Sequence, residues 1–266
     1  MKYGVNLALL VAILWAFGEV EYTKISKKID RANIYFYQFF IRTIVYFSTV
    51  LIFNASIITS FNIDKLFVFL PIILCDLLAS CVVNFAVVNG KLSVVSPIMA
   101  SYPALDILFG LIILGEKIDF LTIILVNVIA ISIIILASNS KNNDTSPHSL
   151  IGIFFAFIYT FLIAISTLFE KNIYYLSYSV YEFYYYKSII YFLVSMIFAF
   201  IIFISPVKIK KPTRSILRGS ILTPIGNVFY SFALSFGNVI VVTPISSIYS
   251  MLTSIISARV LKEKIL

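Results

Sequence analysis

A carboxylate lies inside the first long apolar stretch of this sequence, and few other residues are so clearly suited to binding or proton transfer. Glu19 follows Trp15 and Gly18 within a stretch that runs from residue 3 to residue 22. Burying an ionisable group in hydrocarbon costs at least a few kcal/mol, so such a group needs a reason to be there. Binding and releasing a proton or a cationic solute would supply one. The alternative is that Glu19 lies at the membrane interface with Glu21 and is simply solvated.

Two further acids, Asp76 and Asp106, occupy the middle of later apolar stretches. Arg42, in the second stretch, is a natural partner for one of them. An ion pair that only fixes helix packing is as reasonable an interpretation as a role in substrate binding. Lys187 begins a later stretch, and we expect its long side chain to carry the ammonium group to the interface.

Prolines and polar residues mark two stretches as candidate helix breaks and cavity walls. Pro97 and Pro244 are expected inside helices, where a proline removes one backbone hydrogen bond and frees a carbonyl. Small polar residues on the same faces would equally allow close helix packing. Hydroxyl, amide and aromatic side chains join the three acids in the predicted set of substrate-binding or proton-binding residues, which is Trp15, Glu19, Asp76, Asn84, Tyr102, Asp106, Asn227, Tyr230 and Tyr249.

The residue types available argue against catalysis. The one histidine, His148, lies in the most polar loop, so we expect no histidine-built metal centre or catalytic centre. Cys75 and Cys81 fall within one apolar stretch and are typical of reduced, buried small residues. No phosphate-binding loop is present, and no cofactor is expected. A membrane enzyme therefore remains a minor alternative.

The composition shows that these residues belong to a chain embedded in a membrane. Hydrophobic residues make up 61% of the chain and charged residues only 12%, which is too little charge to cover a soluble domain. The net charge of +8 arises from residues between apolar stretches, so it indicates membrane topology rather than nucleic-acid binding. The aromatic excess, including the run Tyr184-Tyr185-Tyr186, is expected to face lipid or form a belt at the headgroups.

Stretches of about 20 apolar residues are long enough to cross a bilayer as helices. The first has no small-residue cleavage site, so it is interpreted as a span and not as a signal peptide. The sequence predicts nine transmembrane helices, at residues 3–22, 34–53, 66–89, 92–114, 120–137, 150–169, 181–204, 216–236 and 239–261.

An internal repeat relates the two halves of the chain. Residues 84–118 align without a gap to residues 231–265, and the alignment pairs Pro97 with Pro244. Earlier matches pair Gly4 with Gly152 and Arg42 with Lys187, so the first four spans correspond to the sixth to ninth. We therefore divide the chain into a first repeat at residues 1–137, a polar linker at 138–149 and a second repeat at 150–266.

Because five spans precede the second repeat, that repeat crosses the membrane in the opposite sense. Inverted repeats of this kind build two related states around a central site in many secondary transporters. The fifth span has no counterpart, and we expect a tenth helix to be missing from the sequence. Most lysines and arginines lie in loops on the side opposite the N-terminus, which predicts an external N-terminus.

The order of these features resembles the EamA-type drug/metabolite transporter family, whose superfamily also contains the small multidrug resistance proteins. In the first half the family's pattern is matched by Trp15, Arg42, Phe85-Ala86, Pro97 and Gly115-Glu116. In the second half it is matched by Lys187, Phe232-Ala233-Leu234, Pro244 and Lys262-Glu263, where Lys262 replaces the usual glycine. Gly18-Glu19-Val20 followed by Lys27 resembles the first helix of the small multidrug resistance proteins. That resemblance implies that Glu19 binds substrate and protons in turn.

We therefore predict an all-α, polytopic bundle in the cell membrane, built from an inverted repeat of five helices whose second copy lacks its last helix. The predicted function is secondary transport: export or exchange of a small metabolite or drug-like solute by alternating access, with proton coupling. The alternatives are a sugar or nucleotide-sugar antiporter of the same superfamily, and a non-transporting scaffold or incomplete fragment. The expected partners are a small-molecule substrate and the lipid bilayer, with either a monomer or a homodimer open.

Overall fold

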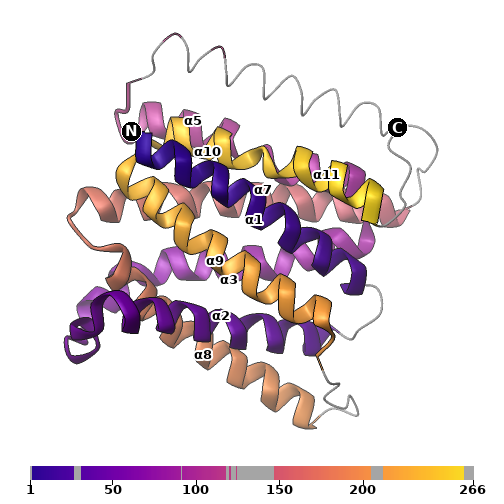
Figure 1. The fold of residues 1–266 in the computed structure, drawn as a ribbon, viewed down its shortest axis with the longest axis horizontal. Helices are drawn as coiled ribbons and strands as arrows, with labels where there is room; N and C mark the ends of the chain where they lie inside the picture. Colours follow the sequence, from indigo (N-terminus) through magenta and orange to yellow (C-terminus); the bar gives the residue numbers. More distant parts are fainter. Residues whose placement is uncertain are drawn as a thin grey trace.

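The computed structural model describes residues 2–26, 31–90, 92–117, 120, 124, 147–204 and 212–260, and all regular secondary structure in these ranges is helical (Figure 1). The predicted fifth span, residues 120–137, lies outside the described residues except for Phe120 and Ile124. The same is true of linker residues 138–146. The described helices are α1 (Lys2–Ser26), α2 (Arg31–Asn54), η1 (Ala55–Thr59), α3 (Ile63–Asn89), α4 (Leu92–Met99), α5 (Tyr102–Ile112), α7 (Pro147–Tyr175), α8 (Val180–Ile204), α9 (Arg214–Phe236), α10 (Val239–Ser247) and α11 (Tyr249–Val260).

Five helical segments of the described chain are long and apolar enough to cross a membrane, and they lie in α1, α2 with η1, α3, α7 and α8. Lipid offers no hydrogen bonds to the backbone, so apolar stretches of this length must form helices there. Many large apolar side chains face outward, with Phe203 85% exposed and Ile112 79% exposed. Apolar surface on this scale requires a lipid environment. The chain is therefore a polytopic all-α membrane protein.

Two of the predicted spans are each divided into two helices. The stretch 92–114 forms α4 and α5, and the stretch 239–261 forms α10 and α11. The breaks fall at equivalent places in the repeat, because α5 begins at Tyr102 and α11 at Tyr249, which the alignment pairs. Pro97 lies in α4 and Pro244 inside α10, each one turn or so before its break. The two breaks therefore lie close to Pro97 and Pro244, the residues that the sequence marks as helix-break candidates.

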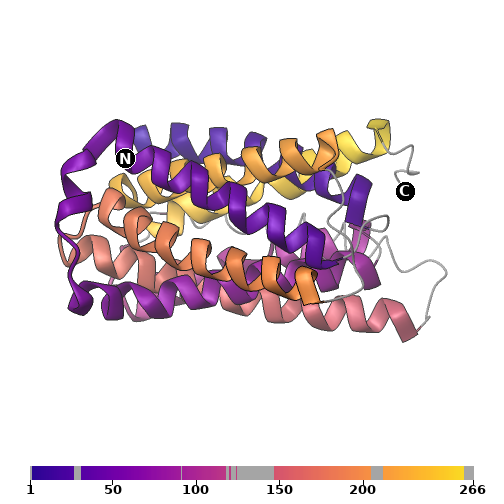
Figure 2. The same cartoon turned by 90° about the horizontal axis from the view of Figure 1, so that it is seen from below.

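The two halves interleave and do not form separate bundles. The most extensive helix pairings are α1 with α9, α2 with α8 and α3 with α7, so each joins one half to the other. Figure 2 shows the long helices running roughly along one common direction. Glycines at Gly4 and Gly152, which the repeat pairs, bring the helices close. A Cβ atom on Gly152 would lie 2.5 Å from Gly90 Cα, and one on Gly4 would lie 3.1 Å from Ala233 O.

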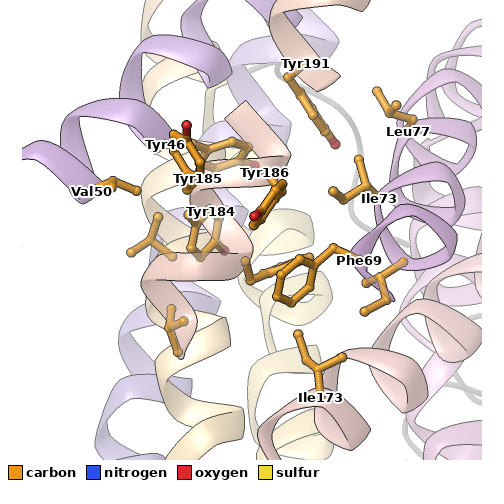
Figure 3. Packing of buried hydrophobic residues seen from close by; sticks show 14 of the residues in the cluster. Tyr46, Val50, Phe69, Ile73, Leu77, Ile173, Tyr184, Tyr185, Tyr186 and Tyr191 are labelled. Atoms are coloured by element: carbon orange, nitrogen blue, oxygen red, sulfur yellow. The ribbon is translucent and has the colours of Figure 1, made fainter. Parts of the chain in front are cut away.

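An aromatic cluster fills the space between α2, α3 and α8 (Figure 3). Tyr184, Tyr185 and Tyr186 all belong to it, and none is more than 8% exposed. The Tyr184 hydroxyl pairs with Ser231 Oγ at 2.7 Å, and the Tyr186 hydroxyl donates to Asn62 O at 3.0 Å. Interpreting this run as a belt at the headgroups was therefore wrong. Buried tyrosines with paired hydroxyls stabilise the contact between the halves.

Candidate functional site

A cavity of about 150 Å³ lies between the two halves, and many of the residues that line it carry charged or polar side chains. Side chains from both repeats line it. Five charged residues contribute to the wall, which are Glu19, Arg42, Asp76, Glu170 and Lys187. The remaining polar lining consists of tyrosines, amides and hydroxyls, including Tyr102, Tyr159, Tyr230, Tyr249, Gln38, Asn84, Asn227 and Thr167. Charged groups gathered in a cavity between membrane helices make it the candidate functional site.

Most of the residues predicted from the sequence meet at this cavity. Its wall contains Trp15, Glu19, Arg42, Asp76, Asn84, Tyr102, Asn227, Tyr230 and Tyr249. Asp106 lies elsewhere, fully buried in α5, and Pro244 of α10 is also outside the lining. The Pro97 side chain lies outside the part of the chain that the structure describes. Whether the lining residues bind substrate stays a prediction.

Glu19 is held in the cavity wall by hydroxyl donors from the two broken helix pairs. Thr253 Oγ1 of α11 donates to Glu19 Oε2 at 2.8 Å, and Ser96 Oγ of α4 lies 3.4 Å from the same oxygen. Glu21 differs, because its carboxylate binds Lys24 Nζ at 2.7 Å. The two acids therefore do not share one environment. The alternative that both are solvated at the interface does not fit this arrangement.

An aromatic wall adjoins Glu19. The Trp15 indole packs against Tyr230 at 5.1 Å between ring centroids and meets Tyr249 edge-on at 5.7 Å. Its Nε1 donates to Asn227 Oδ1 at 2.9 Å. The ring needs Gly226 opposite it, since a Cβ atom there would come within 2.7 Å of Trp15 Cδ1. The wall is thus rigid and apolar with fixed polar edges, which suits a solute with a ring or apolar body.

Lys187 occupies a position that the sequence did not predict. It is 3% exposed and binds Asp76 Oδ2 at 2.9 Å, while the Tyr191 hydroxyl donates to the same oxygen at 2.6 Å. Rings surround the ammonium group, with the Phe183 centroid 4.8 Å and the Tyr46 centroid 5.3 Å away. The expectation that Lys187 extends to the interface was wrong, because α8 begins inside the bundle and these groups hold the charge there.

Among the described residues Arg42 forms no direct ion pair, although its charge interacts with that of Asp76, one of its two expected partners. Its Nη1 donates to Ser80 Oγ at 2.5 Å, and neither oxygen of Asp106, the other expected partner, has a hydrogen-bond partner in the described chain. The guanidinium also approaches the Tyr191 ring, at 5.9 Å to the centroid. Its Nε is buried and has no hydrogen-bond partner among the described residues. Arg42 and Lys187 are equivalent in the repeat, so the cavity holds a pair of related cations.

Glu170 is a cavity residue that sequence reasoning missed. It is 6% exposed and accepts a hydrogen bond from the Tyr174 hydroxyl at 2.8 Å. The predicted sixth span ended at residue 169, whereas α7 continues to Tyr175. The signal that could have found it is the Glu170-Lys171 pair directly after an apolar run, since a charged residue that becomes buried must find a partner.

Lys171 and Glu116 instead satisfy helix ends. Lys171 Nζ donates to the carbonyls of Leu234 and Gly237, both at 2.8 Å, where α9 ends. Glu116 accepts the backbone N–H groups of Val239 and Ile240 at 3.0 and 3.2 Å, where α10 begins. These two side chains form hydrogen bonds with the backbone carbonyl and N–H groups that helix termini leave without partners.

Comparisons with known proteins complete the description of the site. Residues 2–138 and 150–266 each match the model of the EamA-like transporter family. A solved structure titled only as the crystal structure of a protein is similar with a TM-score of 0.75 and 11% sequence identity, over 100% of this chain and 91% of that one. At that identity the similarity concerns the fold. No curated protein matches the chain.

Proposed function

The chain belongs to the EamA-like transporter family, and from that premise we propose that it is a secondary transporter that exports or exchanges a small metabolite or drug-like solute by alternating access. The observation that carries the proposal is the charged cavity between two inverted halves. Such repeats can exchange conformations around a central site. The matched breaks before Tyr102 and Tyr249 supply places where both halves can bend. We assign the protein to the cell membrane with its N-terminus outside, following the charge bias.

The lining favours a small zwitterionic solute, such as an amino acid. Arg42 offers a buried Nε donor without a partner in the described chain, and a carboxylate is the acceptor that suits a guanidinium. Glu19 supplies the opposite charge in the same cavity. The Trp15 ring and its tyrosine neighbours would contact an apolar body. A solute with both charges would give the Arg42 Nε donor an acceptor and would place its cationic group beside the Glu19 carboxylate.

Proton coupling follows from the position of Glu19. A proton and a cationic group of the solute would compete for one carboxylate, so that the arrival of one releases the other. The Thr253 and Ser96 hydroxyls can form hydrogen bonds with the Glu19 carboxyl whether it is protonated or deprotonated, because a hydroxyl both donates and accepts hydrogen bonds. Competition of this kind produces exchange without nucleotide hydrolysis.

The proposal is tested by reconstituting the protein and recording solute-evoked currents on supported membranes under a pH gradient. Amino acids, sugars and organic cations form the panel, and Glu19→Gln is compared with Glu21→Gln, whose carboxylate pairs with Lys24. Trp15 is the one tryptophan of the chain, so its emission reports binding in the same samples.

We expect currents and a Trp15 emission change with amino acids, lost in Glu19→Gln and kept in Glu21→Gln. Currents that persist in Glu19→Gln would show that another carboxyl couples solute movement to protons. Silence with every solute, in protein that remains folded, would contradict transport and favour a scaffold.

A further inference from the structure

The register of the repeat places two polar clusters at equivalent positions. The first consists of Glu19 of α1, Ser96 of α4 and Thr253 of α11. Pairing Gly4 with Gly152 makes Thr167 of α7 the counterpart of Glu19, and pairing Pro97 with Pro244 makes Thr243 of α10 the counterpart of Ser96. The same register pairs Thr253 with Asp106 of α5. The second cluster is therefore Thr167, Thr243 and Asp106, in which Thr243 lies beside Asp106 and Thr167 is linked to it through Tyr230.

Each cluster thus contains one carboxyl and two hydroxyls, but the carboxyl comes from a different helix. In the first cluster it is on α1, and a threonine stands at the equivalent of Asp106. In the second cluster it is on α5, and a threonine stands at the equivalent of Glu19. In the sequence alone, only the first repeat offers a carboxyl for proton coupling at this position, because Thr167, the counterpart of Glu19, is not acidic. The structure supplies the second carboxyl from another helix of the same half.

Within the described chain the Asp106 carboxyl is fully buried and lacks hydrogen-bond donors, which favours binding of a ligand that neutralises it. It is 0% exposed, and neither carboxyl oxygen has a hydrogen-bond partner among the described residues. Thr243 lies beside it, but the Thr243 hydroxyl donates to Val239 O at 3.0 Å. A buried carboxylate without donors is very costly, whereas the same carboxyl with a bound proton is neutral. A proton is the smallest ligand that relieves this cost.

Tyrosines connect Asp106 to the cavity. Tyr102 is one turn earlier on α5 and lies in the cavity wall, as does Tyr230 of α9; both interact electrostatically with Asp106. The Tyr230 hydroxyl pairs with Thr167 Oγ1 at 3.2 Å, which brings the second cluster to the cavity edge. Glu116 is the other charged group near Asp106. On the opposite cluster, Tyr159 and Tyr249 face Glu19.

We propose that Asp106 is a second proton-binding site, equivalent to Glu19 through the inverted repeat, and that the two are open to the cavity in opposite conformations. The inference rests on the proposed function. In the present conformation Glu19 lies in the cavity wall, and Asp106 is sealed behind Tyr102 and Tyr230. Exchange of the two halves' conformations opens the Asp106 cluster and seals the Glu19 cluster. In each conformation one of the two carboxyls, Glu19 or Asp106, is open to the cavity and can bind a proton there.

The test is infrared spectroscopy of the complete protein in lipid during a pH titration, with aspartate carboxyls labelled with ¹³C. A protonated carboxyl has its own C=O stretching band, and the label separates aspartate from glutamate. Neither assignment requires transport, so failure of the proposed function would leave this readout intact. Samples are wild type, Asp106→Asn and Asp64→Asn, whose carboxyl is exposed at the start of α3. Asp106→Thr is a second variant, because the equivalent position of the other half already holds threonine.

We expect a labelled aspartate band in wild type at neutral pH, lost in Asp106→Asn and Asp106→Thr and kept in Asp64→Asn. Absence of an aspartate band in wild type at neutral pH overturns the proposal, and this result does not depend on the folding of any variant. A band that persists in both Asp106 variants also overturns it. Loss of the wild-type band when sodium is added at constant pH would identify a metal cation as the ligand and contradict the proton site.

Discussion

At the scale of residues, the Asp76–Lys187 pair joins α3 of the first half to α8 of the second. The ion pair is 2.9 Å long, and its side chains are 15% and 4% exposed. Removing one member of a buried pair leaves an uncompensated charge and costs about 3–5 kcal/mol. Removing both members costs less, because no charge is then stranded. The pair therefore stabilises the contact between halves as well as the cavity wall.

We predict that Lys187→Met lowers the midpoint of thermal unfolding in detergent substantially, and that adding Asp76→Leu recovers part of the loss. Lys65→Met is the matched control, since Lys65 binds Glu182 at 2.6 Å but is 33% exposed; an exposed pair contributes about 0–1 kcal/mol. Equal losses in Lys187→Met and Lys65→Met would contradict the buried pair.

Individual residues were predicted unevenly from the sequence. Glu19, Trp15 and Tyr249 were found because a charge or aromatic group inside an apolar run is conspicuous in one dimension. Lys187 was misplaced and Glu170 was missed because both lie at the ends of apolar runs, where distance along the chain does not reveal burial. The ion-pair partner of Lys187, Asp76, comes from the other half, so only the packing of the two halves brings the pair together.

At the scale of elements, close glycine contacts set the distance between paired helices. Gly152 of α7 meets Gly90 so closely that an added methyl group would lie 2.5 Å from backbone. Gly4 of α1 makes the equivalent contact more loosely, with Ala233 O 3.1 Å from an added Cβ. Contacts between small residues let helix backbones approach in a membrane, where lipid provides little hydrophobic drive.

We expect Gly152→Ala to destabilise the protein more than Gly4→Ala, measured as thermal unfolding of the two variants in the same lipid. A glycine-to-alanine change inside a helix is otherwise worth about 0.5–1 kcal/mol of stability, so a loss reports the contact. A gain in stability from Gly152→Ala would show that α3 and α7 can separate without cost.

The broken helices show what sequence patterns could and could not reveal about elements. Apolar length predicted the spans that contain α1, α2, α3, α7, α8 and α9, with ends that differ by several residues. The same patterns did not locate the breaks before Tyr102 and Tyr249. Hydropathy has no signal for a helix that stops and resumes within one span, although Pro97 and Pro244 marked the neighbourhood correctly.

At the scale of the whole molecule, the inverted repeat predicts that equivalent residues near the ends of α1 and α7 lie on opposite sides of the membrane. Lys2 and Leu150 are such a pair, and both are exposed. With Cys75 and Cys81 replaced by alanine, we expect Lys2→Cys to react with an impermeant thiol reagent in intact cells. Leu150→Cys should react only after permeabilisation, because positive residues gather on its side. Labelling of both from outside would contradict the inverted topology.

The central claim is that solute and protons exchange through the cavity at Glu19. It is tested most directly by a pH-sensitive dye inside proteoliposomes while a zwitterionic solute is added outside. Solute entry coupled to proton exit makes the lumen more alkaline, so we predict alkalinisation in wild type and in Glu21→Gln, and none in Glu19→Gln. Solute entry with an unchanged or acidified lumen in wild type would contradict the account.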